Sequence, residues 1–253
     1  MFSLPVSGAA IMPRNADGSD DMLLAEAQGT PVEIGIALLA RLCGEEFDAP
    51  ALVVTDFESL LLQLRAARFG QVMTLGFACP HCRALAEISF RVAEYLAEAR
   101  PRQMPGVMPH PSWHGWYRLG EAGFRLPTAG DQAAVAGLDA RLAEARLAER
   151  CMDETARARP HRARVERAME AMAPSLSREI EGQCPACGEA VQAGLVVANL
   201  VIGEFRRAAA AVHDEVDLIA RAYHWPEPLI LSLPQSRRRA YVDRIRRGRA
   251  QAA

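Results

Sequence analysis

Four of the six cysteines stand in two short motifs of the form C-P-x-C, and these residues are the best suited to chemistry. The first motif, CPHC, runs from Cys79 to Cys82, and the second, CPAC, runs from Cys184 to Cys187. A turn of this kind brings two thiolates together and leaves backbone N–H groups free to stabilise sulfur charge. Two such turns supply four soft ligands, which suit one tetrahedral zinc ion. A site closed by four protein ligands is structural and not catalytic.

Two other interpretations of these cysteines stay open at the level of sequence. The cysteines could be free thiols in two separate turns that never share a metal ion. They could also form a redox dithiol, although a redox C-x-x-C motif usually opens a helix after a strand, and both motifs here lie between two expected strands. Residues 83–183 separate the two pairs, which exceeds the usual spacing of a zinc ribbon. A shared site therefore requires the middle of the chain to be an insertion that returns.

Each motif lies between two strand-like segments. Residues 71–78 and 83–92 flank the first motif, and residues 176–183 and 190–197 flank the second. An offset of 105 residues superimposes the cysteines of the first motif on those of the second and aligns the apolar positions that follow them. We interpret this as an internal repeat of a hairpin followed by a helix.

Helix-start signals organise the rest of the chain. A threonine followed three residues later by an acidic residue forms a capping box, which satisfies free N–H groups in the first helical turn. Such boxes begin at Thr30, Thr55 and Thr128. With apolar residues at helical spacing, they predict a short helix near residues 95–96, a helix that starts at residue 129, and helices over residues 31–42, 55–69, 139–153, 163–172, 199–223 and 235–247. Residues 101–127 are expected to be irregular, with one strand near residues 124–126.

The expected fold class is therefore α+β, mostly helical, with two CPxC β-hairpins that form a split zinc-ribbon-like unit and a helical insertion between them. Residues 1–28 mix Gly, Pro, Asn and Asp and are expected to form a flexible N-terminal arm. Residues 29–253 are expected to form a single compact domain. Its parts are the ribbon halves, the insertion and the C-terminal helices, at residues 71–92 and 176–197, 101–175, and 199–248.

The composition is that of a water-soluble globular chain. Among 253 residues, 50% are hydrophobic and 24% are charged, which excludes disordered and collagen-like classes. A net charge of −2 gives no strong attraction to nucleic acid or anionic lipid. The best apolar stretch, residues 193–203, is about half of the ~20 residues that a membrane span requires, and the N-terminus lacks the basic region of a signal peptide. We expect a cytoplasmic protein, in which cysteines bind metal or stay reduced.

Other candidate residues have simpler interpretations. His81 lies inside the first turn, where the repeat has Ala186, so we expect an exposed turn residue and not a ligand. Cys43 and Cys151 lie in helical segments and are expected to be small buried hydrophobic residues. One aromatic cluster is expected to anchor a long loop or to form a partner-binding tip, and its members are His110, Trp113, His114 and Trp116.

The C-terminal segment is strongly basic. Against Asp243 it carries Arg237, Arg238, Arg239, Arg244, Arg246, Arg247 and Arg249. One interpretation is contact with nucleic acid or with an acidic protein face; the simpler one is a solvated helix end, where cations are favoured by the helix dipole. The sequence has no Walker loop, Rossmann glycine fingerprint, G-x-S-x-G elbow or H-E-x-x-H motif. We therefore expect no enzymatic activity and no small-molecule substrate.

The order of the segments, taken together, resembles a known family. The segments are TDFESLLLQLRAARFG, CPHC, LPTAGDQAAVAG, LAERCMDE, CPACG and EVDLIARAYHWPEPLILSLPQSRRRAYVDRI. From about residue 30 to residue 248, this order resembles the baseplate-hub assembly family of T-even-like phages, which also occurs in prophages and in phage-tail-derived contractile injection systems. The chain departs from the family where His224 precedes Trp225, because the family usually has glycine there, and residues 1–29 match none of its segments.

The resemblance implies a role in virion assembly. The protein would be an assembly factor, or chaperone, or a minor component of the baseplate hub, and it would act by binding hub or other tail proteins. The resemblance also implies that Cys79, Cys82, Cys184 and Cys187 are zinc ligands. The alternative is a zinc-ribbon nucleic-acid-binding protein that uses the arginine-rich C-terminal helix.

Overall fold

The computed structural model describes residues 1–44 and 46–252. About half of the residues lie in helices, and every sheet is small and antiparallel, which confirms the expected α+β, mostly helical class. The chain divides into two compact units, each built from two segments. Unit 1 comprises Met1–Ile11 and Asp48–Val201, and unit 2 comprises Met12–Phe47 and Ile202–Ala253.

Unit 1 contains all the strands that the structure describes. Two strands pair near the N-terminus, β1 (Phe2–Ser3) and β2 (Ala10–Ile11). Three others form one sheet, β5 (Val107–Pro109), β6 (Tyr117–Leu119) and β7 (Ala122–Phe124). The short 3-10 helix η1 (Ala49–Ala51) precedes the helices of this unit, which are α3 (Val54–Phe69), α4 (Val92–Glu98), α5 (Ala129–Val135), α6 (Ala140–Cys151), α7 (Glu154–Arg157), α8 (Arg159–Met172) and the first part of α9 (Val197–Ala209).

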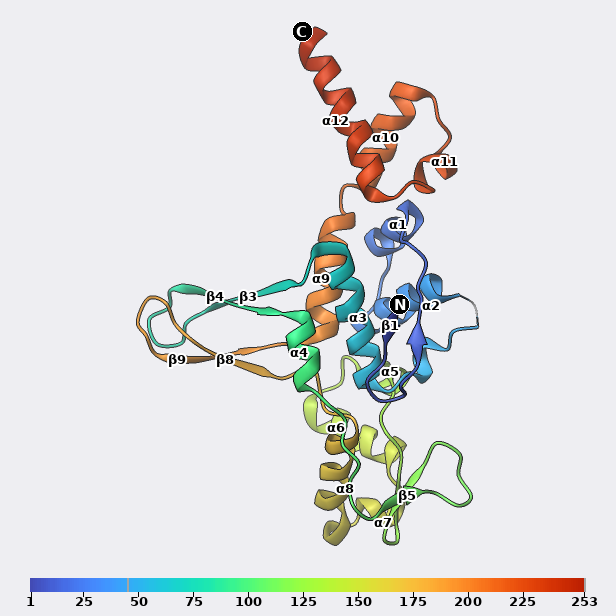
Figure 1. Cartoon of the computed structure of the whole chain (residues 1–253), viewed down its shortest axis with the longest axis vertical. Helices are drawn as coiled ribbons and strands as arrows, with labels where there is room; N and C mark the ends of the chain where they lie inside the picture. The colour runs from blue at the N-terminus through green and yellow to red at the C-terminus, as the bar shows by residue number, and fades with distance from the viewer. Residues whose placement is uncertain (45, 253) are drawn as a thin grey trace. The chain divides into compact units, whose positions relative to one another are not determined.

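Two long β-hairpins extend from the helices of unit 1 and lie beside each other (Figure 1). β3 (Val72–Ala78) pairs with β4 (Leu85–Arg91), and β8 (Glu179–Gln183) pairs with β9 (Ala190–Gly194). These are the two predicted hairpins, each with a cysteine motif at its turn. Each hairpin leads into a helix, α4 after the first and α9 after the second, as the internal repeat predicts.

The regular elements described in unit 2 are all helices. Its helices are α1 (Gly18–Glu26), α2 (Pro31–Cys43), the rest of α9, α10 (Val212–Tyr223), α11 (Glu227–Leu231) and α12 (Gln235–Ala252). α1 contacts α2, α10 and α11, and α10 contacts α12. Residues from both ends of the chain therefore share one small helical core.

The expected division of the chain differs from these two units. Residues 1–28 do not form a separate arm: Leu4 belongs to the core of unit 1, and Leu24, on α1, is fully buried in unit 2. Asp17 caps α1 with a complete capping box. The single compact domain expected over residues 29–253 is likewise replaced by two units, because residues 29–47 group with the C-terminal helices.

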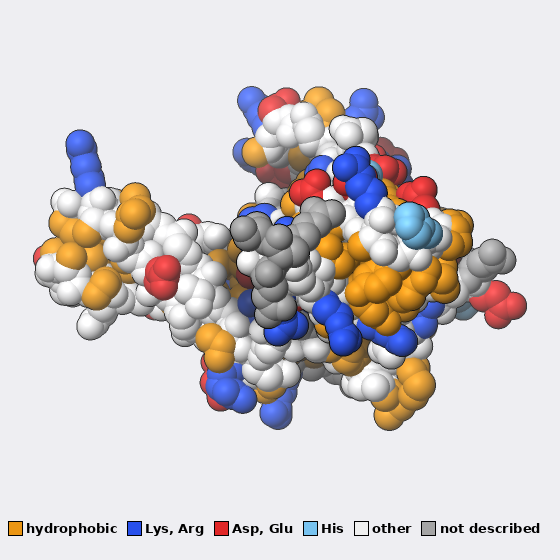
Figure 2. All heavy atoms as spheres, turned by 90° about the horizontal axis from the view of Figure 1, so that it is seen from above, with side chains coloured by type: hydrophobic (Ala, Val, Ile, Leu, Met, Phe, Trp, Pro, Cys, Tyr) orange, Lys and Arg blue, Asp and Glu red, His pale blue; other side chains and the backbone are white. Residues whose placement is uncertain are grey.

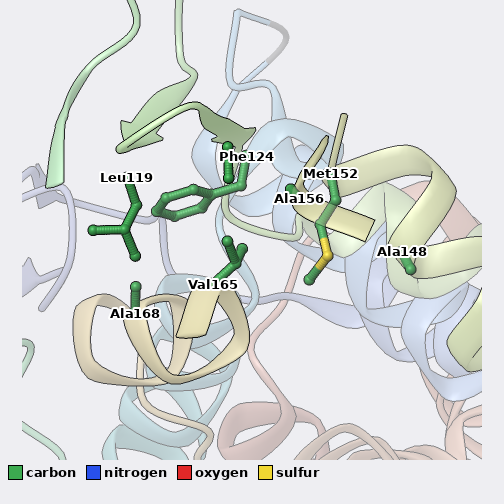
Figure 3. Packing of buried hydrophobic residues seen from close by; sticks show 8 residues of the cluster. Leu119, Phe124, Ala148, Met152, Ala156, Val165 and Ala168 are labelled. Carbon is green, nitrogen blue, oxygen red and sulfur yellow. The ribbon is translucent and has the colours of Figure 1, made fainter. Parts of the chain in front are cut away.

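The insertion between the hairpins has a hydrophobic core of its own. Figure 3 shows the ring of Phe124 pointing toward Leu119, with Val165 of α8 beside it and Met152 nearby. Each of these four side chains is at most 5% exposed. One strand was expected near residues 124–126, and β7 ends at Phe124. The rest of residues 101–127 was expected to be irregular but also contains β5 and β6, because side chains of this small sheet pack on α8 in the core.

Two of the three predicted capping boxes are confirmed. The hydroxyl of Thr30 accepts a hydrogen bond from the Glu33 backbone N–H, and the Glu33 carboxylate accepts one from the backbone N–H of Thr30. Thr128 and Asp131 make the same reciprocal pair at the start of α5. Both helices begin where the sequence predicts, because these bonds satisfy N–H groups that have no partner inside the helix.

The third predicted box, at Thr55, is wrong. α3 begins one residue earlier, after Val53, and the side chain of that residue makes no cap. Thr55 instead donates its hydroxyl proton to the backbone carbonyl of Pro174, and Glu58 accepts a hydrogen bond from Ser177. These polar side chains are buried and tie α3 to the segment before β8, so tertiary contacts use the groups that a local cap would need.

The predicted helix over residues 199–223 is interrupted. α9 ends at Ala209 and α10 begins at Val212, with a turn at residues 210–211. Apolar residues recur at helical spacing on both sides of this turn, which is why the sequence predicted one long helix. A run of alanines at the break carries no side-chain signal for a helix end. Among the described residues, none of the helices has the length and apolar character that crossing a membrane would need.

Candidate metal centre

The tips of the two hairpins bring the four predicted cysteines together. The Sγ atoms of Cys79 and Cys187 lie 3.8 Å apart, and those of Cys82 and Cys184 lie 3.7 Å apart. All four Sγ atoms lie within 4.8 Å of one another. Each short distance joins one cysteine from each hairpin, so the cluster draws equally on two segments that are far apart in sequence.

The two turns have the same backbone geometry. The N–H of Arg83 donates to the carbonyl of Cys79 over 2.9 Å, and the N–H of Gly188 donates to that of Cys184 over 2.8 Å. Arg83 and Gly188 occupy equivalent positions, and both have a positive φ, of 61° and 75°. The left-handed conformation suits glycine and is uncommon for arginine. The turn geometry is therefore imposed in both hairpins, even where the residue does not favour it.

Apolar side chains hold the hairpins together behind the cysteines. Cys79 and Cys184 are buried there with Ala86 and Val191, and Ile88 packs against this cluster. A Cβ atom at Gly182 would lie 2.7 Å from Cδ1 of Ile88. The isoleucine of one hairpin thus occupies the space that the glycine of the other leaves open. Cys82 and Cys187 lie on the exposed side of the cluster.

The thiols influence one another's ionisation. Backbone N–H groups of Cys187 and Ala186 lower the pKa of Cys184 to about 6. The pKa of Cys187 is raised to about 12: the backbone N–H of Glu189 favours its thiolate, but desolvation and the neighbouring sulfurs outweigh that contribution. One thiolate therefore forms readily, and its charge opposes ionisation of the next. A bound cation would remove this repulsion and allow all four sulfurs to be thiolates.

The arrangement is compatible with one structural metal site. Distances of 3.7 and 3.8 Å are well beyond the ~2.05 Å of a disulfide bond, and the four cysteines are free thiols. Both C-x-x-C turns lie between antiparallel strands and not at the start of a helix, which is the observation that argued against a redox dithiol. A cluster of four sulfurs provides one ligand atom from each residue and completes a tetrahedron without any other group.

The other candidate ligands are outside this cluster. His81 is exposed in its turn, and the four cysteines alone form the metal-ligand group found among the described residues. The Nδ1 atom of His110 accepts hydrogen bonds from the N–H groups of Ser112 and Trp113, and its ring stacks on Trp113. These contacts order the loop between β5 and β6.

The two remaining cysteines are not placed to act as ligands. Burial raises the pKa of Cys43 to about 11. Cys151 is buried, its thiol donates to the carboxylate of Asp131, and burial together with the negative charge of that carboxylate raises its pKa to about 12. Both thiols therefore stay protonated at neutral pH, and only Cys151 is fully buried as the sequence predicted.

A buried ion-pair network in unit 2 was not predicted. Arg238, which the sequence placed on a solvated basic helix, is fully buried and pairs with Asp21 and Glu215. It also donates to the carbonyl of Leu233. The network joins α1, α10 and α12. No local pattern could have indicated it, because Asp21 lies at the other end of the chain.

A buried carboxyl group in unit 1 was also missed. Glu58 is 1% exposed, and burial raises its pKa. Its Oε1 accepts from Ser177, while its Oε2 and the Oε1 of Gln132 are buried without a hydrogen-bond partner in the part of the chain that the structure describes. The carboxyl lies in a region of structural contacts, away from the cysteine cluster.

Comparison of the chain with protein-family models, with curated proteins and with solved structures returns no match. The resemblance to the baseplate-hub assembly family therefore rests on the sequence segments quoted above.

Proposed function

We propose that the four cysteines bind one structural zinc ion. In a regular tetrahedron with Zn–S bonds of about 2.3 Å, neighbouring sulfurs lie about 3.8 Å apart. The distances between opposite hairpins, 3.7 and 3.8 Å, agree with that value. Zinc would hold two cysteines from each hairpin and leave no open position for a substrate or water.

The ion would connect parts of unit 1 that are far apart in sequence. In sequence, the β3–β4 hairpin precedes the insertion and the β8–β9 hairpin follows it. The apolar cluster that the two hairpins share is small. A metal that joins their tips would keep the two hairpins together, and the insertion that they flank in sequence would then be held at both ends. Binding of zinc would therefore be coupled to folding.

We propose that the protein is a non-enzymatic assembly factor, or a minor component, of the baseplate hub of a contractile phage tail or phage-tail-like injection system. The observation that carries this proposal is the closed four-sulfur cluster at the tips of two hairpins, which suits a rigid binding protein. The specific role comes from the resemblance of its ordered segments to the baseplate-hub assembly family. The partners would be hub or other tail proteins, met in the cytoplasm before the particle is complete.

Co-purification with hub proteins tests this role. The full chain would be expressed with the hub and tail-tube proteins encoded near it, purified at about 0.2 M salt and separated by size. We expect a complex of fixed stoichiometry with a hub subunit and none with an unrelated acidic protein of similar size. A chain that ignores every tail protein but binds duplex DNA tightly at this salt concentration would contradict the proposal.

The same result would favour the second candidate, a zinc-ribbon nucleic-acid-binding protein. One observation supports that candidate: α12 carries exposed arginines that form no ion pair within the described structure, namely Arg237, Arg244, Arg246 and Arg247. Phosphate contacts made by such residues weaken steeply as salt is added. A titration of duplex DNA against salt concentration therefore separates the two candidates.

A further inference from the structure

An aromatic cluster in unit 2 forms a surface that the cysteine site does not use. Tyr223 ends α10, and the next residue, His224, adopts a left-handed conformation with φ of 55° that turns the chain. Trp225 then stacks on Tyr223 with ring centroids 5.1 Å apart, and Tyr241 of α12 meets both rings edge-on, at 5.5 and 5.1 Å. We call these three residues the aromatic triad.

The triad is only half-buried, and it is part of a larger apolar surface. Beneath it lie Ile219, Ile230 and Val242, which are at most 5% exposed. On α11, Leu229 precedes the buried Ile230 in sequence and is 47% exposed. Figure 2, in which the molecule is seen from above, shows a broad hydrophobic patch with basic and acidic side chains around it. Contiguous apolar surface of this kind in a soluble protein marks an interaction site.

The polar ends of the triad are unused. Among the hydrogen bonds of the described residues, none involves the two tyrosine hydroxyls or the indole N–H of Trp225, so each of these groups is available to a partner. Tyrosine, tryptophan and arginine are the residues that contribute most to binding at protein interfaces, because they combine a large apolar area with polar groups. The triad and its surroundings have this composition.

The charge around the triad indicates the partner's chemistry. On α12, Arg237 and Arg244 lie four residues before and three residues after Tyr241, so they flank it on the helix surface. Both are exposed, and neither pairs with an acidic residue within the described structure. The exposed acidic residues described on the same helices do not pair with these two arginines. Two such arginines beside an apolar centre are complementary to aliphatic or aromatic side chains that stand between aspartates or glutamates.

We propose that the triad binds an acidic amphipathic helix of a partner protein, with apolar side chains on the rings and carboxylates on Arg237 and Arg244. This inference deepens the proposed function and rests on it for the existence of a protein partner. A second copy of this chain fits less well, because Arg237 and Arg244 of the two copies would meet. Nucleic acid is the other class of partner that arginines and aromatic rings can bind, and the test below includes it as an outcome that would overturn the proposal.

Synthetic peptides test this binding with the whole protein. The probe is a labelled amphipathic helix of about five turns, with leucines on one face and glutamates on its borders. Two matched peptides replace the glutamates by lysines or scramble the order so that the apolar face is lost. Fluorescence anisotropy at about 0.15 M salt reports binding. We expect the acidic amphipathic peptide to bind at least about tenfold more tightly than either matched peptide.

Variants of the protein locate the binding. The double variant R237E/R244E should weaken binding about tenfold or more, and W225A should weaken it by a similar factor. The control R141E/R167E makes the same change in net charge on α6 and α8 of unit 1 and should leave the affinity unchanged. Circular dichroism checks that each variant is folded. R237E/R244E changes only exposed residues, so this variant can still test the proposal if W225A does not fold.

Three results would overturn the inference. The first is equal binding of the acidic, basic and scrambled peptides. The second is binding of the acidic peptide that survives both R237E/R244E and W225A. The third is a single-stranded oligonucleotide that binds more tightly than the peptide and is weakened by the same variants. If hub proteins are captured while the peptides do not bind, the aromatic triad is not the binding site and the proposed function stands. If the acidic peptide binds but no tail protein is captured, the binding site stands and the proposed function is wrong.

Discussion

Replacement of Cys184 by serine should destabilise unit 1 strongly. Cys184 lies 3.7 Å from Cys82 of the other hairpin, and a metal joining the two closes a loop that contains residues 83–183. By analogy with covalent cross-links, closing a loop of about 100 residues stabilises a folded chain by about 4–5 kcal/mol. Domains are stable by only about 5–15 kcal/mol. With only three sulfurs left, the site should bind zinc much more weakly, so a large part of this contribution to the free energy of unfolding should be lost.

Thermal unfolding followed by circular dichroism measures this effect, with and without a zinc chelator. We expect the parent chain to lose stability on chelation and C184S to be destabilised before any chelator is added. C43S is the matched control, because that thiol is outside the cluster, and it should unfold like the parent and respond to the chelator in the same way. Equal stability of C184S and the parent, in both conditions, would refute the reasoning.

Three further experiments test other parts of the account. Arg238→Ala removes the buried cation that pairs with Asp21 and Glu215 and should lower the free energy of unfolding by about 3–5 kcal/mol. Arg239→Ala removes an exposed side chain with a 3.7 Å contact to Glu215 and should cost less than about 1 kcal/mol; similar losses in denaturant titrations would contradict the network. Gly182→Val places a side chain in the space of Ile88 and should cost about 1–3 kcal/mol, and adding Ile88→Ala should recover part of it in a double-mutant cycle. Glu58→Gln should stabilise the chain by about 1 kcal/mol at neutral pH. Burial raises the pKa of Glu58 in the folded state above its pKa in the unfolded state. Glutamate therefore lowers the free energy of unfolding at pH values above the folded pKa, where it is ionised, and has no such effect below the unfolded pKa, where it is protonated in both states. The gain from glutamine should therefore vanish as the pH is lowered through this range, and a gain that persists at acid pH would refute this assignment.

The sequence predicted the elements that depend on local signals. Two cysteine motifs at a fixed offset, each between strand-like segments, predicted the hairpins and the residues that meet at their tips. Thr30 and Thr128 predicted helix starts because their caps use only neighbouring groups. In each case the chemistry that forms the element is contained within a few residues of chain.

The features that were missed depend on contacts between distant segments. Thr55 has the sequence of a cap but bonds to Pro174. Arg238 belongs to a basic run, and only the presence of α1 and α10 explains why it is buried. The division into two units has the same cause, since residues 12–47 pack with the C-terminal helices. No periodicity in a single segment reports such pairings.

Metal analysis combined with X-ray absorption spectroscopy tests the central claim most directly. Protein purified without chelator should contain one zinc ion per chain, with four sulfur neighbours at about 2.3 Å. Chains that hold no zinc after purification in its presence, or zinc bound by fewer than four sulfurs, would contradict the account.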